Sequence, residues 1–169
     1  MLRQAFLAGA VAVGLGAASA LAADEAFVMK AAKGGMAEVE LGKLAAEKGM
    51  SPGVKKFGQR MADDHGKAGD ELKTLAQNKP ITLPADIDPK DKALRARLIK
   101  LSGAAFDHAY MQAMVADHVK DVNEFKMEAK AGKDPDVKAW AAKTLPTLQD
   151  HLKQARETNG TVATSRTKQ

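Results

Sequence analysis

The sequence contains no cysteine. Disulfide bonds, thiol redox chemistry and a lipid-modified cysteine are therefore excluded. Aromatic residues make up only 4% of the 169 residues and β-branched residues are sparse, whereas Ala, Lys, Leu, Glu and Met dominate. This composition is typical of helices, and a chain of this length buries its own core without covalent staples. We therefore expect one all-α domain.

Charged residues are frequent but are not segregated by sign. The net charge is +5, yet Lys and Arg are interleaved with Asp and Glu along most predicted helical faces. A nucleic-acid-binding protein would instead carry a clustered basic face with aromatic side chains for base stacking. We therefore expect no nucleic acid among the partners. The sequence indicates no particular protein partner, and a homo-oligomer is compatible with it.

No apolar run reaches the roughly 20 residues that a membrane-spanning helix needs. The longest run, residues 5–18, follows the basic residue Arg3 and precedes the small residues Ala20 and Ala22. This order is typical of a secretory signal peptide. We predict a signal peptide over residues 1–22, cleavage after Ala22, and a periplasmic or secreted protein without a transmembrane segment. Retention of the leader as an uncleaved anchor is the alternative.

Apolar residues recur at three- and four-residue steps in four long segments, which indicates amphipathic helices. The predicted helices span residues 25–48, 52–78, 104–131 and 135–157. A long connector with a short helical pattern at residues 89–101 joins the second to the third. We predict a bundle domain over residues 23–157 and a disordered tail over residues 158–169. Gly34 and Gly35 each weaken the first helix by about 1 kcal/mol, unless a closely packed neighbour uses the missing side chain.

Two internal repeats relate the halves of the chain. The pattern M-x-x-D-H occurs at residues 61–65 and again at residues 114–118. The signal that ends one helix and starts the next, residues 49–52, returns at residues 132–135, with Gly first and Pro last in both. Proline is favoured at the first position of a helix. We therefore predict two similar helical hairpins that form a four-helix bundle.

All four histidines directly follow an aspartate. Three of them lie on the inward stripes of the second, third and fourth predicted helices, and Glu38 takes the equivalent place in the first. Counted from the hairpin turns, these four residues lie ~18 to 27 Å along helices of ~40 Å. We therefore predict that one layer inside the bundle contains Glu38, His65, His118 and His151.

A carboxylate and three imidazoles in an apolar core suit a divalent transition metal, and Zn, Cu, Ni and Fe are all compatible with them. We predict that these four side chains bind a single ion. The neighbouring aspartates point about 100° away around each helix, so we expect them to accept the outer ring N–H of a histidine on another helix. These are Asp64, Asp117 and Asp150. A separate polar feature near the connector would consist of Asp107 and Tyr110.

The same residues allow a structural interpretation. A buried His–Asp network can fix packing and bind nothing. The protein would then be a cell-envelope interaction or stress-response module, sensitive to pH because His titrates near pH 6.5. A metal-binding protein would serve storage, buffering or stress response and would be non-catalytic or weakly redox-active. A hydrolase ranks third, because no nucleophile stands in a recognisable motif.

Several spaced motifs resemble one family of exported proteins, the domain of unknown function family 4142. They are Ala26 with Phe27, residues 34–42, residues 61–65, residues 103–107 with Tyr110, residues 114–118 and residues 143–151. The resemblance implies a ferritin-like four-helix bundle in which the long connector is a crossover. Members are often labelled predicted outer membrane proteins, but no spanning helix is encoded here. The family supplies no established activity. The absence of Glu-x-x-His disfavours a di-iron oxidase or ferroxidase.

Overall fold

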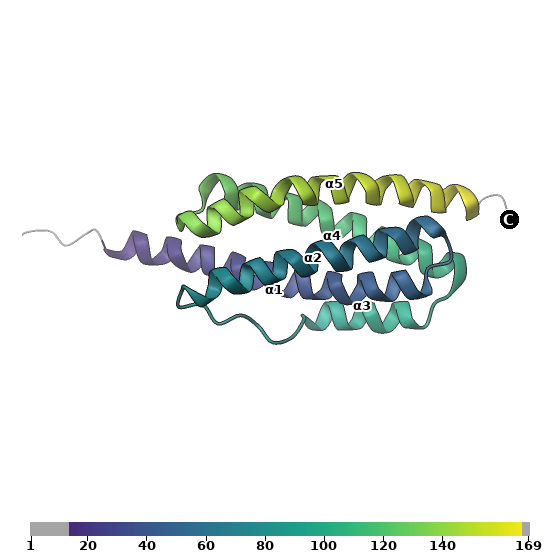
Figure 1. The fold of residues 1–169 in the computed structure, drawn as a ribbon, viewed down its shortest axis with the longest axis horizontal. Coiled ribbons are helices and arrows are strands. Elements are labelled where there is room, and N and C mark those ends of the chain that lie inside the picture. The colour runs from purple at the N-terminus through teal and green to yellow at the C-terminus, as the bar shows by residue number, and fades with distance from the viewer. Residues whose placement is uncertain (1–13, 167–169) are drawn as a thin grey trace, which may run out of the picture.

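The computed structural model describes residues 14–166 of the chain as five helices (Figure 1). They are α1 (Gly14–Lys48), α2 (Pro52–Gln77), α3 (Pro89–Ile99), α4 (Gly103–Ala131) and α5 (Pro135–Arg166). No strand occurs among the described residues. The predicted all-α fold is confirmed, and each of the four long helices contains one of the predicted helical segments almost completely.

Two antiparallel hairpins, α1 with α2 and α4 with α5, make up the bundle. The hairpins pack together through α2 against α5 and α1 against α4. Because α2 ends at one end of the bundle and α4 begins at the other, the connector runs back along the outside and carries α3 against α1 (Figure 1). This long crossover between two hairpins is the connectivity of ferritin-like bundles. None of the described helices combines the length and apolar character of a membrane span.

The two hairpin turns are built alike. Ser51 is the N-cap of α2, and its hydroxyl accepts a hydrogen bond from the backbone N–H of Val54. Asp134 does the same for α5, because its carboxylate accepts from the N–H groups of Asp136 and Val137. Both caps precede a proline at the first helical position, as the repeat predicted.

Each turn is also held by an aspartate from the opposite hairpin. Asp107 of α4 accepts hydrogen bonds at 2.8 Å from the backbone N–H groups of Met50 and Ser51. Asp24 of α1 accepts from the N–H groups of Lys133 and Asp134. Both aspartates are buried. The predicted polar feature at Asp107 is therefore a brace for the α1–α2 turn and is not bonded to the connector.

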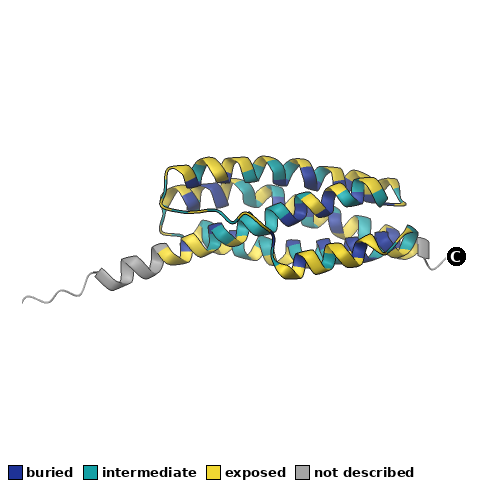
Figure 2. Cartoon of the chain, turned by 90° about the horizontal axis from the view of Figure 1, so that it is seen from below, coloured by how far each residue is buried: buried dark blue, intermediate teal, exposed yellow. Residues whose placement is uncertain are grey.

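Buried residues alternate with exposed ones along the helices (Figure 2). The buried apolar side chains form two clusters. One cluster surrounds the α1–α2 turn and includes Phe57, Phe106 and Tyr110. The other surrounds the α4–α5 turn and includes Phe125 and Trp140. Along each long helix, one buried polar residue lies between the residues that belong to the first cluster and those that belong to the second. These residues are Glu38, His65, His118 and His151.

The ends of the chain differ from the prediction. Residues 158–166 were expected to be disordered, but α5 continues to Arg166 and Val162 is buried in the first cluster. The prediction was wrong because Val162 continues the inward spacing of Leu148 and Ala155, so the last turns still have a face to bury. Residues 167–169 lie outside the described part of the chain. So do the first 13 residues of the predicted leader, while α1 runs through the predicted cleavage point.

Replacing Asp107 with alanine should lower the free energy of unfolding by about 2–4 kcal/mol. The substitution leaves two backbone N–H groups of a turn without their acceptor, and each such loss costs about 1–3 kcal/mol. Denaturant unfolding measures the change. Asp63→Ala is the control, because Asp63 is exposed and bonds only with Gln59 on its own helix. Equal destabilisation by the two variants would contradict the bracing role of Asp107.

Candidate metal centre

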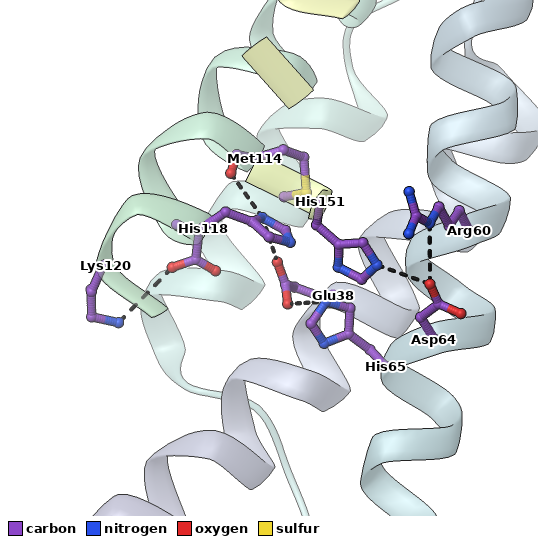
Figure 3. A network of polar contacts seen from close by, with 9 residues as sticks. Glu38, Arg60, Asp64, His65, Met114, His118, Lys120 and His151 are labelled. Atoms are coloured by element: carbon purple, nitrogen blue, oxygen red, sulfur yellow. Dashed lines mark hydrogen bonds and ion pairs between the residues drawn. The ribbon is translucent and has the colours of Figure 1, made fainter. Parts of the chain in front are cut away.

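Four buried polar residues meet at the middle of the bundle, one from each long helix (Figure 3). Glu38 comes from α1, His65 from α2, His118 from α4 and His151 from α5, and none is more than 8% exposed. The three imidazole rings lie 5.3–5.7 Å apart between centroids. One ring nitrogen of each histidine lies within 4.8 Å of the other two. The layer predicted from helix depth is therefore present.

Glu38 lies against two of the histidines. Its Oε2 is 2.7 Å from Nε2 of His65, and its Oε1 is 3.2 Å from Nδ1 of His118. These contacts are ion pairs when the imidazoles are protonated, and both Glu38 oxygens and His65 Nε2 have no other polar partner among the described residues. His118 Nε2 and His151 Nδ1 have no hydrogen-bond partner at all in the described part of the chain. Five buried polar atoms at one place thus lack a partner outside the layer, and two of them lack any partner, which native interiors rarely tolerate.

In His118 and His151, the other ring nitrogen makes a hydrogen bond that fixes the ring. His118 Nδ1 donates to the backbone carbonyl of Met114 at 2.9 Å. His151 Nε2 donates to Asp64 at 2.9 Å, and Asp64 in turn accepts from Arg60. With these tautomers, the unpartnered His118 Nε2 and His151 Nδ1 carry lone pairs. An outer hydrogen bond that fixes the ring is the usual arrangement around a metal-bound histidine.

Of the three aspartates expected to support histidines, the structure places only Asp64 in that position. Asp150 is 57% exposed on its side chain and pairs with Arg60 at 2.7 Å. Asp117 lies 3.9 Å from Lys120 and bonds to no histidine in the described part of the chain. The prediction for Asp117 and Asp150 was wrong because no histidine of another helix lies beside either side chain. Asp150 points toward solvent and Asp117 toward Glu38 of α1. Tyr110 packs between Phe57 and Phe106, and its hydroxyl has no partner among the described residues.

Sequence reasoning missed Asp121. A carboxylate oxygen of Asp121 lies within 4.8 Å of one from Glu38 and one from Asp117. The sequence contained a signal for Asp121. Glu38 and Asp121 are separated by the same number of residues as Gly49 and Gly132, and as Asp24 and Asp107. Asp121 is therefore the counterpart of Glu38 in the second hairpin.

The charges of the layer depend on one another. Burial by itself raises the pKa of Glu38, but the neighbouring His65, His118 and His151 outweigh it and lower the pKa to about 2. Burial lowers the pKa of His65, and Glu38 overcomes this effect, so its net pKa is raised. Burial and the other two imidazoles lower the pKa of His151 to about 4, against the opposing effect of Asp64. At neutral pH the layer thus contains an ionised carboxylate and a neutral His151.

The donor set fits a transition metal. Three imidazole nitrogens and one carboxylate are the ligand types that Zn, Cu, Ni and Fe share. The atoms that would ligate the ion are the same buried atoms that lack a hydrogen-bond partner in the described structure. Residues from all four helices would hold it, so bound metal would tie the two hairpins together.

Solved structures with the same fold include three of one protein. They are described as "CopM in the Cu(I)-bound form", "CopM in the Cu(II)-bound form" and "CopM in the Ag-bound form (by co-crystallization)". The TM-scores are 0.65, 0.68 and 0.63 and the identities 18%, 15% and 18%. The aligned parts cover 79%, 82% and 79% of this chain and 93%, 96% and 93% of the CopM chains. At these identities the similarity shows a shared fold.

No functionally curated protein matches the chain. A family model does match, over residues 11–158, which include α2, α3, α4 and most of α1 and α5. It contains the motifs that carried the resemblance in the sequence. The chain belongs to the family described as domain of unknown function 4142.

Proposed function

We propose that this protein binds a single transition metal ion through Glu38, His65, His118 and His151, in a storage, buffering or stress role outside the cytoplasm. The observation that carries the proposal is the set of five buried ligand atoms, drawn from four helices, that have no polar partner outside the layer in the described structure. Two of them, His118 Nε2 and His151 Nδ1, have no partner at all, which costs about 1–3 kcal/mol each, and a metal ion would engage all five atoms at once.

Copper is the first metal to test. The CopM structures that share this fold hold Cu(I), Cu(II) or Ag. Among divalent first-row metals, Cu²⁺ binds nitrogen and oxygen donors most strongly, and imidazole suits it well. Zn, Ni and Fe remain compatible with the donor set. The protein would contribute one ligand from each of four helices at a buried site.

Export is the second part of the proposal. Residues 1–22 have the order of a signal peptide, and the buried residues of the bundle begin at Asp24 in the part of the chain for which burial is described. Asp24 is 4% exposed and caps the α4–α5 turn, two residues after the predicted cleavage point. Cleavage after Ala22 would therefore remove the leader and leave this brace intact.

The metal-binding proposal predicts one equivalent of copper per chain and its loss in His118→Ala. The fourth histidine supplies a matched control, because His108 is on the same helix but outside the layer. Elemental analysis after loading and desalting gives the stoichiometry, and bound copper should raise the melting temperature by mass action. A wild-type chain that retains no metal, with a melting temperature insensitive to chelator, would instead favour the structural His–Asp network.

Asp64→Asn should weaken metal binding by roughly 10- to 100-fold without changing its stoichiometry. The amide is a poorer acceptor for the N–H of His151, so the ring is less well oriented and less basic. Asp150→Asn is the matched control, since Asp150 contacts the same Arg60 but no histidine. Competition with a chelator of known affinity measures the change. Equal affinities of the two variants would exclude a positioning role for Asp64.

The export proposal predicts that the protein recovered from the periplasm begins at Ala23. Intact-mass measurement or N-terminal sequencing tests this directly. Ala20→Leu should block processing, because signal peptidase requires small residues before the cut. Recovery of the full chain in the cytoplasm would refute export and would leave the metal-binding proposal untouched.

A further inference from the structure

A cavity of about 580 Å³ lies beside the polar layer, between α1, α2, α4 and the connector, with part of its wall from α5. Its volume is within the range of about 300–1,000 Å³ that is usual for small-molecule sites. The cavity reaches Glu38 and His65 at one end. It therefore joins the surface to the buried layer.

Glycines of α1 and α2 create much of this space. Gly34, Gly35, Gly66 and Gly69 all line the cavity, and a Cβ atom added to any of them would meet nothing within 4 Å. They are unlike Gly42 and Gly58, where an added Cβ would lie 2.6 Å from the backbone of the other helix. Helix packing therefore explains Gly42 and Gly58 but not the four cavity glycines. Each of the four weakens its helix by about 1 kcal/mol, and the result is open volume.

The walls of the cavity are mostly apolar. Phe27, Leu72, Phe125 and Trp140 contribute large side chains, and Leu83 of the connector closes one side. A path for a hydrated metal ion needs neither this volume nor these walls. An organic molecule with an apolar body would bury its surface against them.

The polar part of the lining is acidic. Seven carboxylates and four lysines line the cavity, although the chain as a whole has a net charge of +5. Most of these carboxylates are paired with lysine, for example Glu124 with Lys30 and Asp70 with Lys73. Asp121 has no hydrogen bond or ion pair with any described residue. Its carboxylate lies within 4.8 Å of those of Glu38 and Asp117, so a cation beside it would relieve the repulsion among three carboxylates.

We propose that this cavity binds a small organic cation, an amine whose apolar body lies against Phe125 and Trp140 and whose ammonium group lies between Asp117 and Asp121. Charge complementarity selects an ammonium over a carboxylate or an alcohol. The proposal does not require a metal at the histidine layer. Because Glu38 and His65 border both sites, a bound amine would also limit access to the layer.

Trp140 is the only tryptophan of the chain, so its fluorescence reports on the cavity directly. Metal-free protein is titrated at pH 7.5 with octylamine, 1-octanol and octanoate, which share one apolar body. We expect octylamine to change the emission and to bind at least about tenfold more tightly than 1-octanol, because it adds a charge-assisted contact. Equal binding of octylamine and 1-octanol, tighter binding of octanoate, or no response to octylamine would overturn the proposal.

Two variants separate the apolar and the charged contributions. Gly69→Leu fills the cavity and should abolish the response to octylamine, whereas Gly160→Leu places the same side chain at an exposed helical glycine outside the cavity and should not. Asp121→Asn should remove the preference for octylamine over 1-octanol while both still bind. Retention of that preference in Asp121→Asn would overturn the assignment of the ammonium position. Copper stoichiometry, measured separately on Gly69→Leu, reports on the metal proposal alone.

Discussion

The structure depends on how a charged layer is compensated inside an apolar bundle. Glu38 is fully buried and ionised, and burying an isolated carboxylate is among the most unfavourable events in folding. Contact with His65 offsets this charge, and the rings of His151 and His118 are fixed from outside by Asp64 and by the carbonyl of Met114. The layer divides the core into two clusters, so each helix must place one polar residue at the right depth. That requirement constrains the register of all four helices.

Glycines of α1 and α2 have opposite effects on the two sides of the layer, close packing on one and open space on the other. Gly42 and Gly58 bring the backbones of α1 and α2 into direct contact on one side of Glu38. Gly34, Gly35, Gly66 and Gly69 leave space on the other side. Close approach on one side fixes the position of Glu38 against His65. Open space on the other gives the layer its route to the surface.

Sequence periodicity predicted the four long helices, the two hairpins and the meeting of Glu38 with three histidines. These predictions depend on 3.6-residue geometry and on capping residues, which act locally. The roles of Asp117 and Asp150 could not be predicted in this way, because they depend on which helix stands beside each side chain. Val162 was missed because the residues around it are polar, so its continuation of the inward spacing of Leu148 and Ala155 was overlooked. Asp121 was missed for a different reason. The repeat was visible in the glycine and proline residues of the turns, but Glu38 was not compared with the residue at the same spacing in the second hairpin.

The reciprocal braces at the hairpin turns have a consequence for how the chain folds. Asp24 and Asp107 each supply acceptors for a turn in the other hairpin. An isolated hairpin would therefore keep its own helices but lack the acceptor for its own turn. Although the two halves are similar in sequence, each supplies part of the other's turn. Docking of the hairpins therefore completes both ends of the bundle, which couples the stability of one half to that of the other.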